Sequence, residues 1–209
     1  MILYRPVGVE ELLLIYRSGL RCFPPRLPGQ PIFYPVLNEE YAIQIARDWN
    51  AAGEGLVGYV MVFDVDDEYS KLFEPHQVGG RIHQELWVPA EALDEFNSHI
   101  QGIIRLAAAY FGPGFVGRVP NAFSLRGKDA GAQLEALRGI HRYSLMDFHG
   151  EVVANHETVF AHFPYWEQHV AMDAPRNAEG TALLAAIRRV WAGAFPSIPL
   201  GVQARTLPS

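Results

Sequence analysis

The segment GGRIHQELWVP, residues 79–89, combines a glycine pair with an alternating run that ends at a proline. Successive side chains of a strand point to opposite faces. One face then carries His83, Glu85 and Trp87. The other face carries Ile82, Gln84, Leu86 and Val88. The pattern is typical of an edge strand with one solvated face, and its carboxylate lies between an imidazole and an indole beside a flexible glycine loop.

The composition indicates one large domain, or a domain with a substantial appendage. The chain has 209 residues, of which 49% are hydrophobic and 19% charged, enough for a buried core. A net charge of −6 argues against non-specific nucleic-acid binding. Cys22 is the only cysteine, so an intrachain disulfide and a thiolate zinc cluster are excluded. No apolar run approaches the ~20 residues that span a bilayer, and we expect a soluble, cytoplasmic protein without a membrane partner.

Local signals predict the secondary structure of the first half. Asn38 is a candidate N-cap, with two glutamates in the first turn of the helix that follows it. Tyr41, Ile45 and Trp49 share one face of that helix. Strands are expected at residues 2–7, 31–34, 58–65 and 102–106. Helices are expected at residues 9–18 and 39–50, with one or two helical turns at 89–97. The acidic residues 64–68 do not have the spacing of a calcium loop, and we expect a solvated turn there.

A cluster of glycine and proline at residues 112–117 predicts a boundary. We therefore expect one domain over residues 1–112 and a mainly helical region over 113–209, which either stands apart or packs with the first. Helices are expected in the second region at residues 130–137, 152–169 and 181–195.

The order of elements in the first 110 residues resembles the ADP-ribosyltransferase family, which includes bacterial toxins and poly-ADP-ribose polymerases. Those enzymes carry an Arg or His on the first strand, an aromatic or hydroxyl group in a second motif, and a Glu at the head of a late strand. The matching positions here are Arg5, Tyr34 with Tyr41, and Glu85. The resemblance implies an α+β fold, the split antiparallel β-sandwich of that family. The C-terminal region has no counterpart in it.

The same resemblance implies an NAD-dependent mono-ADP-ribosyltransferase that releases nicotinamide. Arg5 would hold the pyrophosphate, and Tyr34 or Tyr41 would stack on nicotinamide. Glu85 would stabilise the oxocarbenium-like transition state. His83 stands where many arginine-modifying members have Glu or Gln; it is a candidate base, an acceptor-orienting group or a solvated neighbour. The acceptor stays open among protein, nucleic acid and small molecule.

Two other classes of function remain open. A non-catalytic binding module, such as a partner or immunity-type protein, would keep the fold while Arg5 and Glu85 do not meet in one cleft. The second region carries histidines at separations of seven, six and seven, namely His149, His156, His162 and His169. They suggest a metal-dependent hydrolase as a weaker alternative, although nearby aromatic residues favour a packing face, and we expect no metal site. The helical region is also a candidate homodimer interface.

Overall fold

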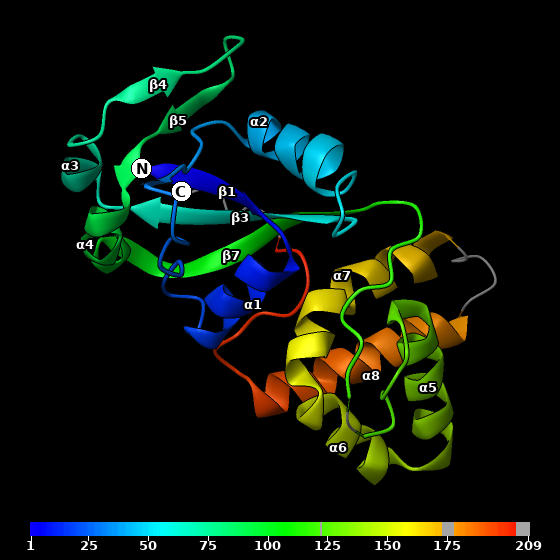
Figure 1. Ribbon diagram of the computed structural model, residues 1–209. Helices are drawn as coiled ribbons and strands as arrows, with labels where there is room; N and C mark the ends of the chain where they lie inside the picture. The colour runs from blue at the N-terminus through cyan, green and yellow to red at the C-terminus, as the bar shows by residue number, and fades with distance from the viewer. Residues whose placement is uncertain (122, 173–177, 204–209) are drawn as a thin grey trace. The chain divides into compact units, whose positions relative to one another are not determined.

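The computed structural model describes residues 1–121, 123–172 and 178–203 (Figure 1). The chain forms two compact units, Met1–Gly112 and Pro113–Gly201. Val202 and Gln203 return to the first unit, where the Gln203 amide donates to the Leu106 carbonyl at 2.8 Å. The boundary between the two units lies between Gly112 and Pro113, within the glycine- and proline-rich segment 112–117. The protein has an α+β fold with antiparallel sheets, which confirms the α+β class predicted from the sequence.

The first unit is built on a three-stranded antiparallel sheet in the order β1-β3-β7. Its strands are β1 (Ile2–Val7), β3 (Val57–Val65) and β7 (Ile100–Phe111). β7 is longer than the predicted segment because apolar residues continue to Phe111 and pair with β3 throughout. The helix α1 (Val9–Arg17) covers one face, and α2 (Glu39–Gln44) covers the other (Figure 1).

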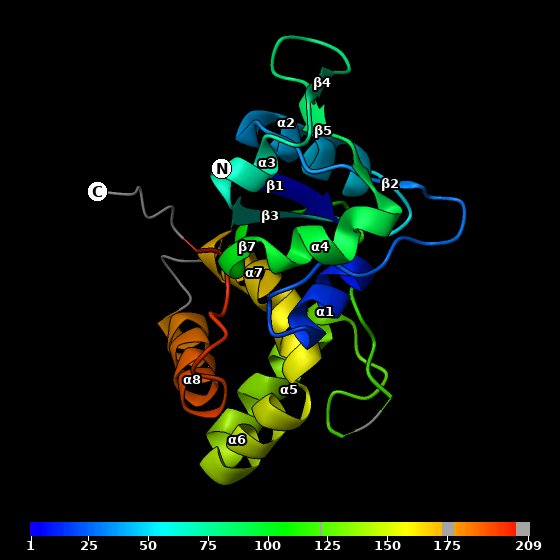
Figure 2. The ribbon, with the colours of Figure 1, turned by 90° about the vertical axis from the view of Figure 1, so that its left-hand side faces the viewer.

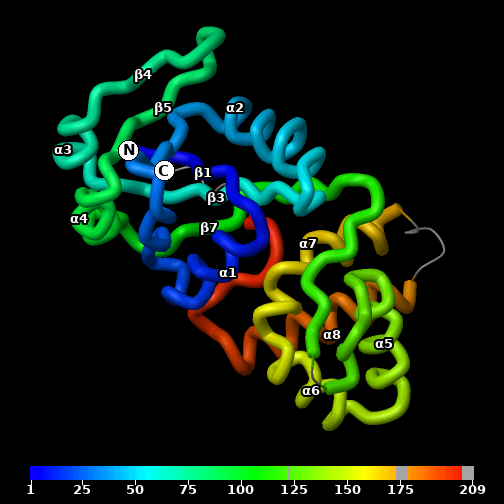
Figure 3. The backbone as a smooth tube through the Cα atoms, viewed as in Figure 1, coloured from blue at the N-terminus to red at the C-terminus, as the bar shows by residue number. Residues whose placement is uncertain are grey.

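Two short strand pairs complete the first unit. β2 (Ile32–Phe33) pairs with β6 (Val88–Pro89), and β4 (Pro75–Gln77) pairs with β5 (Gln84–Leu86). The β4–β5 hairpin projects from the rest of the unit, as Figure 2 shows from the side, and Figure 3 shows its backbone doubling back at the tip. The glycine pair of the quoted segment therefore lies at the tip of an arm.

The helix predicted after Asn38 is present, but its second half is a π-helix. The Asn38 side chain accepts from the Glu40 amide at 2.9 Å and caps α2. The chain continues into η1 (Ile45–Asn50), whose backbone lies on β3. A Cβ at Gly58 would stand 2.0 Å from the Ala46 carbonyl oxygen. Only glycine permits this close approach of η1 to the sheet.

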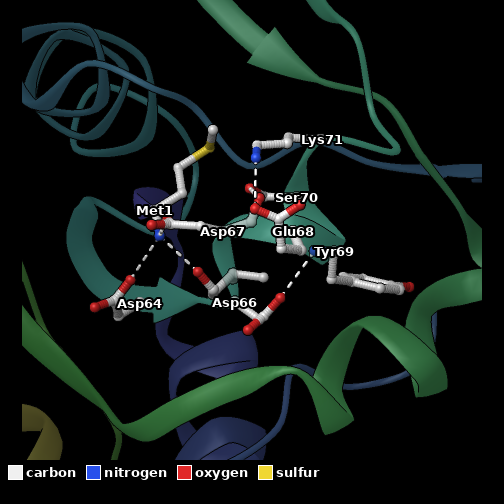
Figure 4. Close-up of polar contacts among 9 residues, drawn as sticks. Met1, Asp64, Asp66, Asp67, Glu68, Tyr69, Ser70 and Lys71 are labelled. Atoms are coloured by element: carbon white, nitrogen blue, oxygen red, sulfur yellow. Dashed lines mark hydrogen bonds and ion pairs between the residues drawn. The ribbon is translucent and has the colours of Figure 1, made fainter.

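The acidic segment after β3 is a short helix rather than the expected solvated turn. The Asp66 side chain caps α3 (Asp67–Ser70) by accepting from the Tyr69 amide. The Met1 ammonium binds the carboxylates of Asp64 and Asp67 (Figure 4). Burial alone would lower the pKa of that ammonium, but its hydrogen bonds to Asp67 and Asp64 and their negative charges together outweigh burial and raise it. The acids thus hold the start of β1 in place. The unit also contains η2 (Ala90–Ala92) and α4 (Leu93–Ser98).

The second unit consists of helices over the residues that the structure describes. They are α5 (Ala130–Tyr143), α6 (Leu145–Ala154), α7 (His156–Met172) and α8 (Ala178–Ala194). The prediction of a single helix at 152–169 is wrong, because the helix is interrupted at Asn155. There the Asn155 side chain donates back to the Glu151 carbonyl at 3.0 Å and ends α6. No helix in the described residues is long and apolar enough to span a membrane.

A buried polar network joins α7 to the loop before α5. The His162 Nε2 accepts from the Arg118 amide at 2.8 Å, so its Nδ1 carries the proton and donates to the Gln133 Oε1 at 2.7 Å. The Gln133 amide in turn donates to the carbonyls of Arg118 and Lys128. Burial, followed by the charge of Arg118, lowers the pKa of His162 to about 3. His162 is therefore a neutral structural histidine.

This network predicts an acid-sensitive second unit. The imidazole of His162 binds a proton below pH ~6.5 in the unfolded chain but only near pH 3 in the folded unit. The contribution of His162 to the free energy of unfolding is therefore fully present above pH ~6.5 and is lost as the pH falls toward 3. From pH 7 to pH 5 the free energy of unfolding should drop by about 2 kcal/mol. Urea titrations at several pH values, followed through the buried Trp166 and Trp191, measure this drop.

His162→Gln should reduce the drop between pH 7 and pH 5, whereas His149→Gln, at an exposed site on α6, should keep it in full. An imidazole NMR signal of His162 that titrates near pH 6.5 in the folded protein would contradict the assignment.

Gly58→Ala tests the close approach of η1 to β3. The added methyl meets backbone atoms that cannot turn away, and we expect a loss of about 3 kcal/mol in the free energy of unfolding. Gly55→Ala is the matched control, since a Cβ there meets nothing within 4 Å. Equal thermal midpoints for the two variants would show that η1 can shift without cost.

Candidate functional site

One pocket of the first unit brings together most of the residues that the sequence singled out. Its volume is about 610 Å³. Arg5, Tyr34, Tyr41 and Glu85 all lie in its wall. The remaining lining residues are Pro6, Val7, Gly8, Glu11, Val36, Ile45, Trp49, Asn50, Gly53, Glu54, Gly55 and Val57.

Val36 creates this convergence. Its amide and carbonyl both bond with Tyr4 of β1, at 2.8 and 2.9 Å. On its other side it bridges to Glu85 of β5. Before Val36, however, the chain turns away from β1, and Ile32 and Phe33 pair with β6 instead. The pocket lies where these segments diverge, with residues 5–8 on one side and Tyr34 on another.

Arg5 is held firmly at this point. Its Nε and Nη2 donate to the two carboxylate oxygens of Glu11, at 3.0 and 3.2 Å, and its Nη1 donates to the Tyr34 carbonyl at 3.2 Å. The guanidinium also lies over the Phe33 ring, 5.1 Å from its centre. The Arg5 side chain is 12% exposed and that of Glu11 22%, so the pair is largely shielded from water.

Glu11 also faces a second arginine that sequence reasoning missed. Arg26 Nη1 lies 4.0 Å from Glu11 Oε1, and its Nε is buried without a hydrogen-bond partner in the described residues. Burial, followed by repulsion from Arg5, lowers the pKa of Arg26. Two guanidinium groups thus share one carboxylate. Arg26 comes from a proline-rich loop whose sequence has no period, so no local signal marked it.

Tyr41 lies on α2, and its ring is held in place by the ring of His83. The two rings stack with centroids 4.5 Å apart. Nδ1 of His83 accepts from the Gly80 amide at 3.1 Å, so Nε2 carries the proton and donates to the Gln44 Oε1 at 2.9 Å. A Cβ at Gly79 would stand 2.5 Å from Nδ1, so the glycine pair lets the tip of the hairpin close over this ring.

His83 therefore does not occupy the position expected of a base. Both ring nitrogens are engaged within the protein, and His83 does not line the pocket. Its observed contacts support Tyr41. The clue in the sequence was the glycine pair, but the partner Gln44 lies 39 positions earlier and could not be inferred from spacing.

Glu85 has its own fixed neighbour. The Trp87 Nε1 donates to Glu85 Oε1 at 2.9 Å, as their placement on one face of the segment allows. Tyr41 lies close by: its pKa is raised by burial first and by the Glu85 charge second. The carboxylate thus faces the same region as the Tyr41 phenol.

The pocket wall also contains residues that were not predicted as site residues. Trp49 on η1 is 57% exposed although it is a large apolar side chain, and Asn50 and Glu54 line the pocket as well. The spacing of Tyr41, Ile45 and Trp49 had indicated a shared face, and all three do line the pocket. A π-helix often marks a functional site, which was not visible in the sequence.

The histidines of the second unit do not assemble. His149 lies on α6 and His156 on α7, so they do not share a helix face. His162 is buried in the network above, and His169 stacks on Tyr165. Among the described residues no group of three or more His, Cys, Asp or Glu side chains could hold a metal ion.

The Arg5–Glu11 pair should stabilise the first unit. Glu11→Gln leaves a shielded guanidinium without its counter-ion, and we expect the free energy of unfolding to fall by about 2 kcal/mol. Glu10→Gln, at an exposed site one residue away, should change it by less than about 0.5 kcal/mol. Urea unfolding followed by circular dichroism measures both, and equal values would show that the pair contributes nothing.

No protein-family model, curated protein or solved structure matches this chain. What the pocket can do chemically is therefore inferred from its own side chains.

Proposed function

We propose that the first unit is an NAD-dependent mono-ADP-ribosyltransferase of the split β-sandwich type. The observation that carries the proposal is the common pocket of Arg5, Tyr34, Tyr41 and Glu85. These are the residues that the family resemblance named, and they come from three separate segments of the chain. A volume of about 610 Å³ also lies within the usual range of small-molecule and cofactor sites.

The pyrophosphate of NAD would lie between Arg5 and the start of α1. Gly8 provides no side-chain cap to that helix, so its first amides can face an anion. Arg5 is already paired with Glu11, but Arg26 adds a second positive charge to the same carboxylate. A dianionic pyrophosphate could therefore displace Glu11 from Arg5 while Glu11 keeps Arg26 as its partner.

Nicotinamide would pack against the aromatic side of the pocket. His83 covers one face of the Tyr41 ring and Tyr41 is only 5% exposed, so the ligand would pack mainly against the half-buried Tyr34. The nicotinamide ring of NAD carries a positive charge, and aromatic faces attract cations.

Glu85 would act on the bond that breaks. Nicotinamide leaves the ribose C1′ with the bonding electron pair and becomes neutral, while positive charge develops on the ribose. The free oxygen of Glu85 would accept a hydrogen bond from a ribose hydroxyl and stabilise that charge. The acceptor nucleophile then bonds to C1′ and gives up its proton.

The arrangement favours this enzyme over the two alternatives. A non-catalytic module was expected to keep Arg5 and Glu85 apart, yet both line one pocket. A metal-dependent hydrolase lacks a ligand cluster in the described part of the chain. The acceptor can belong to any of the three classes considered above, because no pocket residue distinguishes them.

Glu85→Gln tests the proposal directly. The amide keeps the size of the side chain but removes its charge, so nicotinamide release should fall at least about 100-fold while NAD affinity changes little. Chromatography of nicotinamide, with water, a protein mixture and oligonucleotides as acceptors, and calorimetry of NAD binding measure the two effects.

The control is Glu74→Gln, at an exposed glutamate just before β4, which should leave release unchanged. A wild-type protein that neither binds NAD nor releases nicotinamide with any of these acceptors would overturn the proposal.

A further inference from the structure

Trp87 holds the carboxylate on which the proposed chemistry depends. Its indole N–H donates to Oε1 of Glu85 at 2.9 Å. An ionised carboxylate has two oxygens that accept hydrogen bonds. The indole therefore occupies one of them and leaves Oε2 for a ligand.

The indole is itself held by rings from two other segments. His76 of β4 stacks on it with centroids 4.3 Å apart and planes 19° from parallel. Tyr34, which lines the pocket, meets it edge-on at 6.1 Å and 89°. In the β4–β5 pairing His76 stands directly opposite Glu85, so the stack and the hydrogen bond are set by the same strand register.

The burial of Trp87 does not account for this arrangement. Its side chain is 41% exposed, whereas the neighbouring Leu86 and Val88 are fully buried and anchor the segment to the core. A partly exposed tryptophan with its N–H aimed at a pocket carboxylate is therefore placed for that contact.

A neutral donor has a specific advantage here. Arg5 neutralises Glu11 with a full positive charge, whereas an indole N–H fixes the orientation of Glu85 and leaves its negative charge intact. A carboxylate that must stabilise a positive transition state needs both its charge and a fixed orientation.

We propose that Trp87 is the positioning residue for Glu85: its N–H holds Oε1 so that Oε2 faces the ribose. This role rests on the proposed transferase function. It acts on the transition state through Glu85 and involves no contact between Trp87 and NAD.

Trp87→Phe is the decisive variant because it keeps a ring between His76 and Tyr34 but removes the donor. We expect kcat for nicotinamide release to fall about 10- to 100-fold with KM for NAD within about twofold. In a Glu85→Gln background the same change should have less than about a twofold further effect. Tyr143→Phe, at an exposed aromatic on α5 of the second unit, is the matched control and should leave kcat unchanged.

An unchanged kcat in Trp87→Phe overturns the proposal. So does a rise in KM without a fall in kcat, because it would make Trp87 a ligand contact.

A second measurement needs no turnover. A carboxylate accepts a stronger hydrogen bond than a neutral amide, so the indole N–H resonance of Trp87 should move on the change Glu85→Gln and stay in place in the control Glu74→Gln. A resonance that does not move in Glu85→Gln overturns the positioning role. If the wild type releases no nicotinamide the transferase proposal fails, and the indole resonance still decides whether Trp87 holds Glu85.

Discussion

The backbone pairing of Val36 is the constraint on which the site depends. A segment of three residues, 35–37, bonds to β1 on one side and to β5 on the other: Val36 pairs with Tyr4, while the Leu37 amide donates to the Gln84 carbonyl and the Leu86 amide to the Pro35 carbonyl. Residues directly opposite in antiparallel pairs face the same side. Glu85 is thereby fixed relative to β1, although 80 positions separate it from Arg5. Because the chain leaves β1 immediately before residues 35–37, a pocket opens beside the place where this segment joins β1 to β5.

Three of the four side chains of the candidate site have a neighbour that fixes them. Arg5 is held by Glu11, Tyr41 by His83, and Glu85 by Trp87. The contacts of Tyr41 and Glu85 restrict these side chains, so less conformational entropy is left for them to lose on binding. The β4–β5 hairpin supplies two of the three supporting residues, since His83 lies at its tip and Trp87 follows β5. The β4–β5 hairpin therefore supports the pocket wall, and the glycines at its tip lie against the ring of His83.

The sequence carried enough information for most local elements and for four residues of the pocket wall, but not for the rest of the wall or for its supporting contacts. The Asn38 cap, the apolar stripe of α1 and the alternation that puts Trp87 beside Glu85 are short-range patterns, and the structure confirms them. Glu11, Arg26 and Gln44 contact site residues through the fold alone, so no period or spacing reveals them. The break at Asn155 was missed for a different reason: apolar residues continue on both sides of it, and one side-chain hydrogen bond ends the helix.

The charges of the pocket wall favour a positive group near Glu85. Three glutamates and one arginine line it, and Glu11 is paired with Arg5. Among the described residues neither Glu54 nor Glu85 has an ion-pair partner, so the negative charge of both remains available. Such a wall would repel an anionic group placed near Glu85 and attract a positive one. Under the proposed function, NAD would bind with its pyrophosphate toward Arg5 and its nicotinamide-ribose toward Glu85. The positive charge that would develop on the ribose would then lie beside a carboxylate without an ion-pair partner among the described residues.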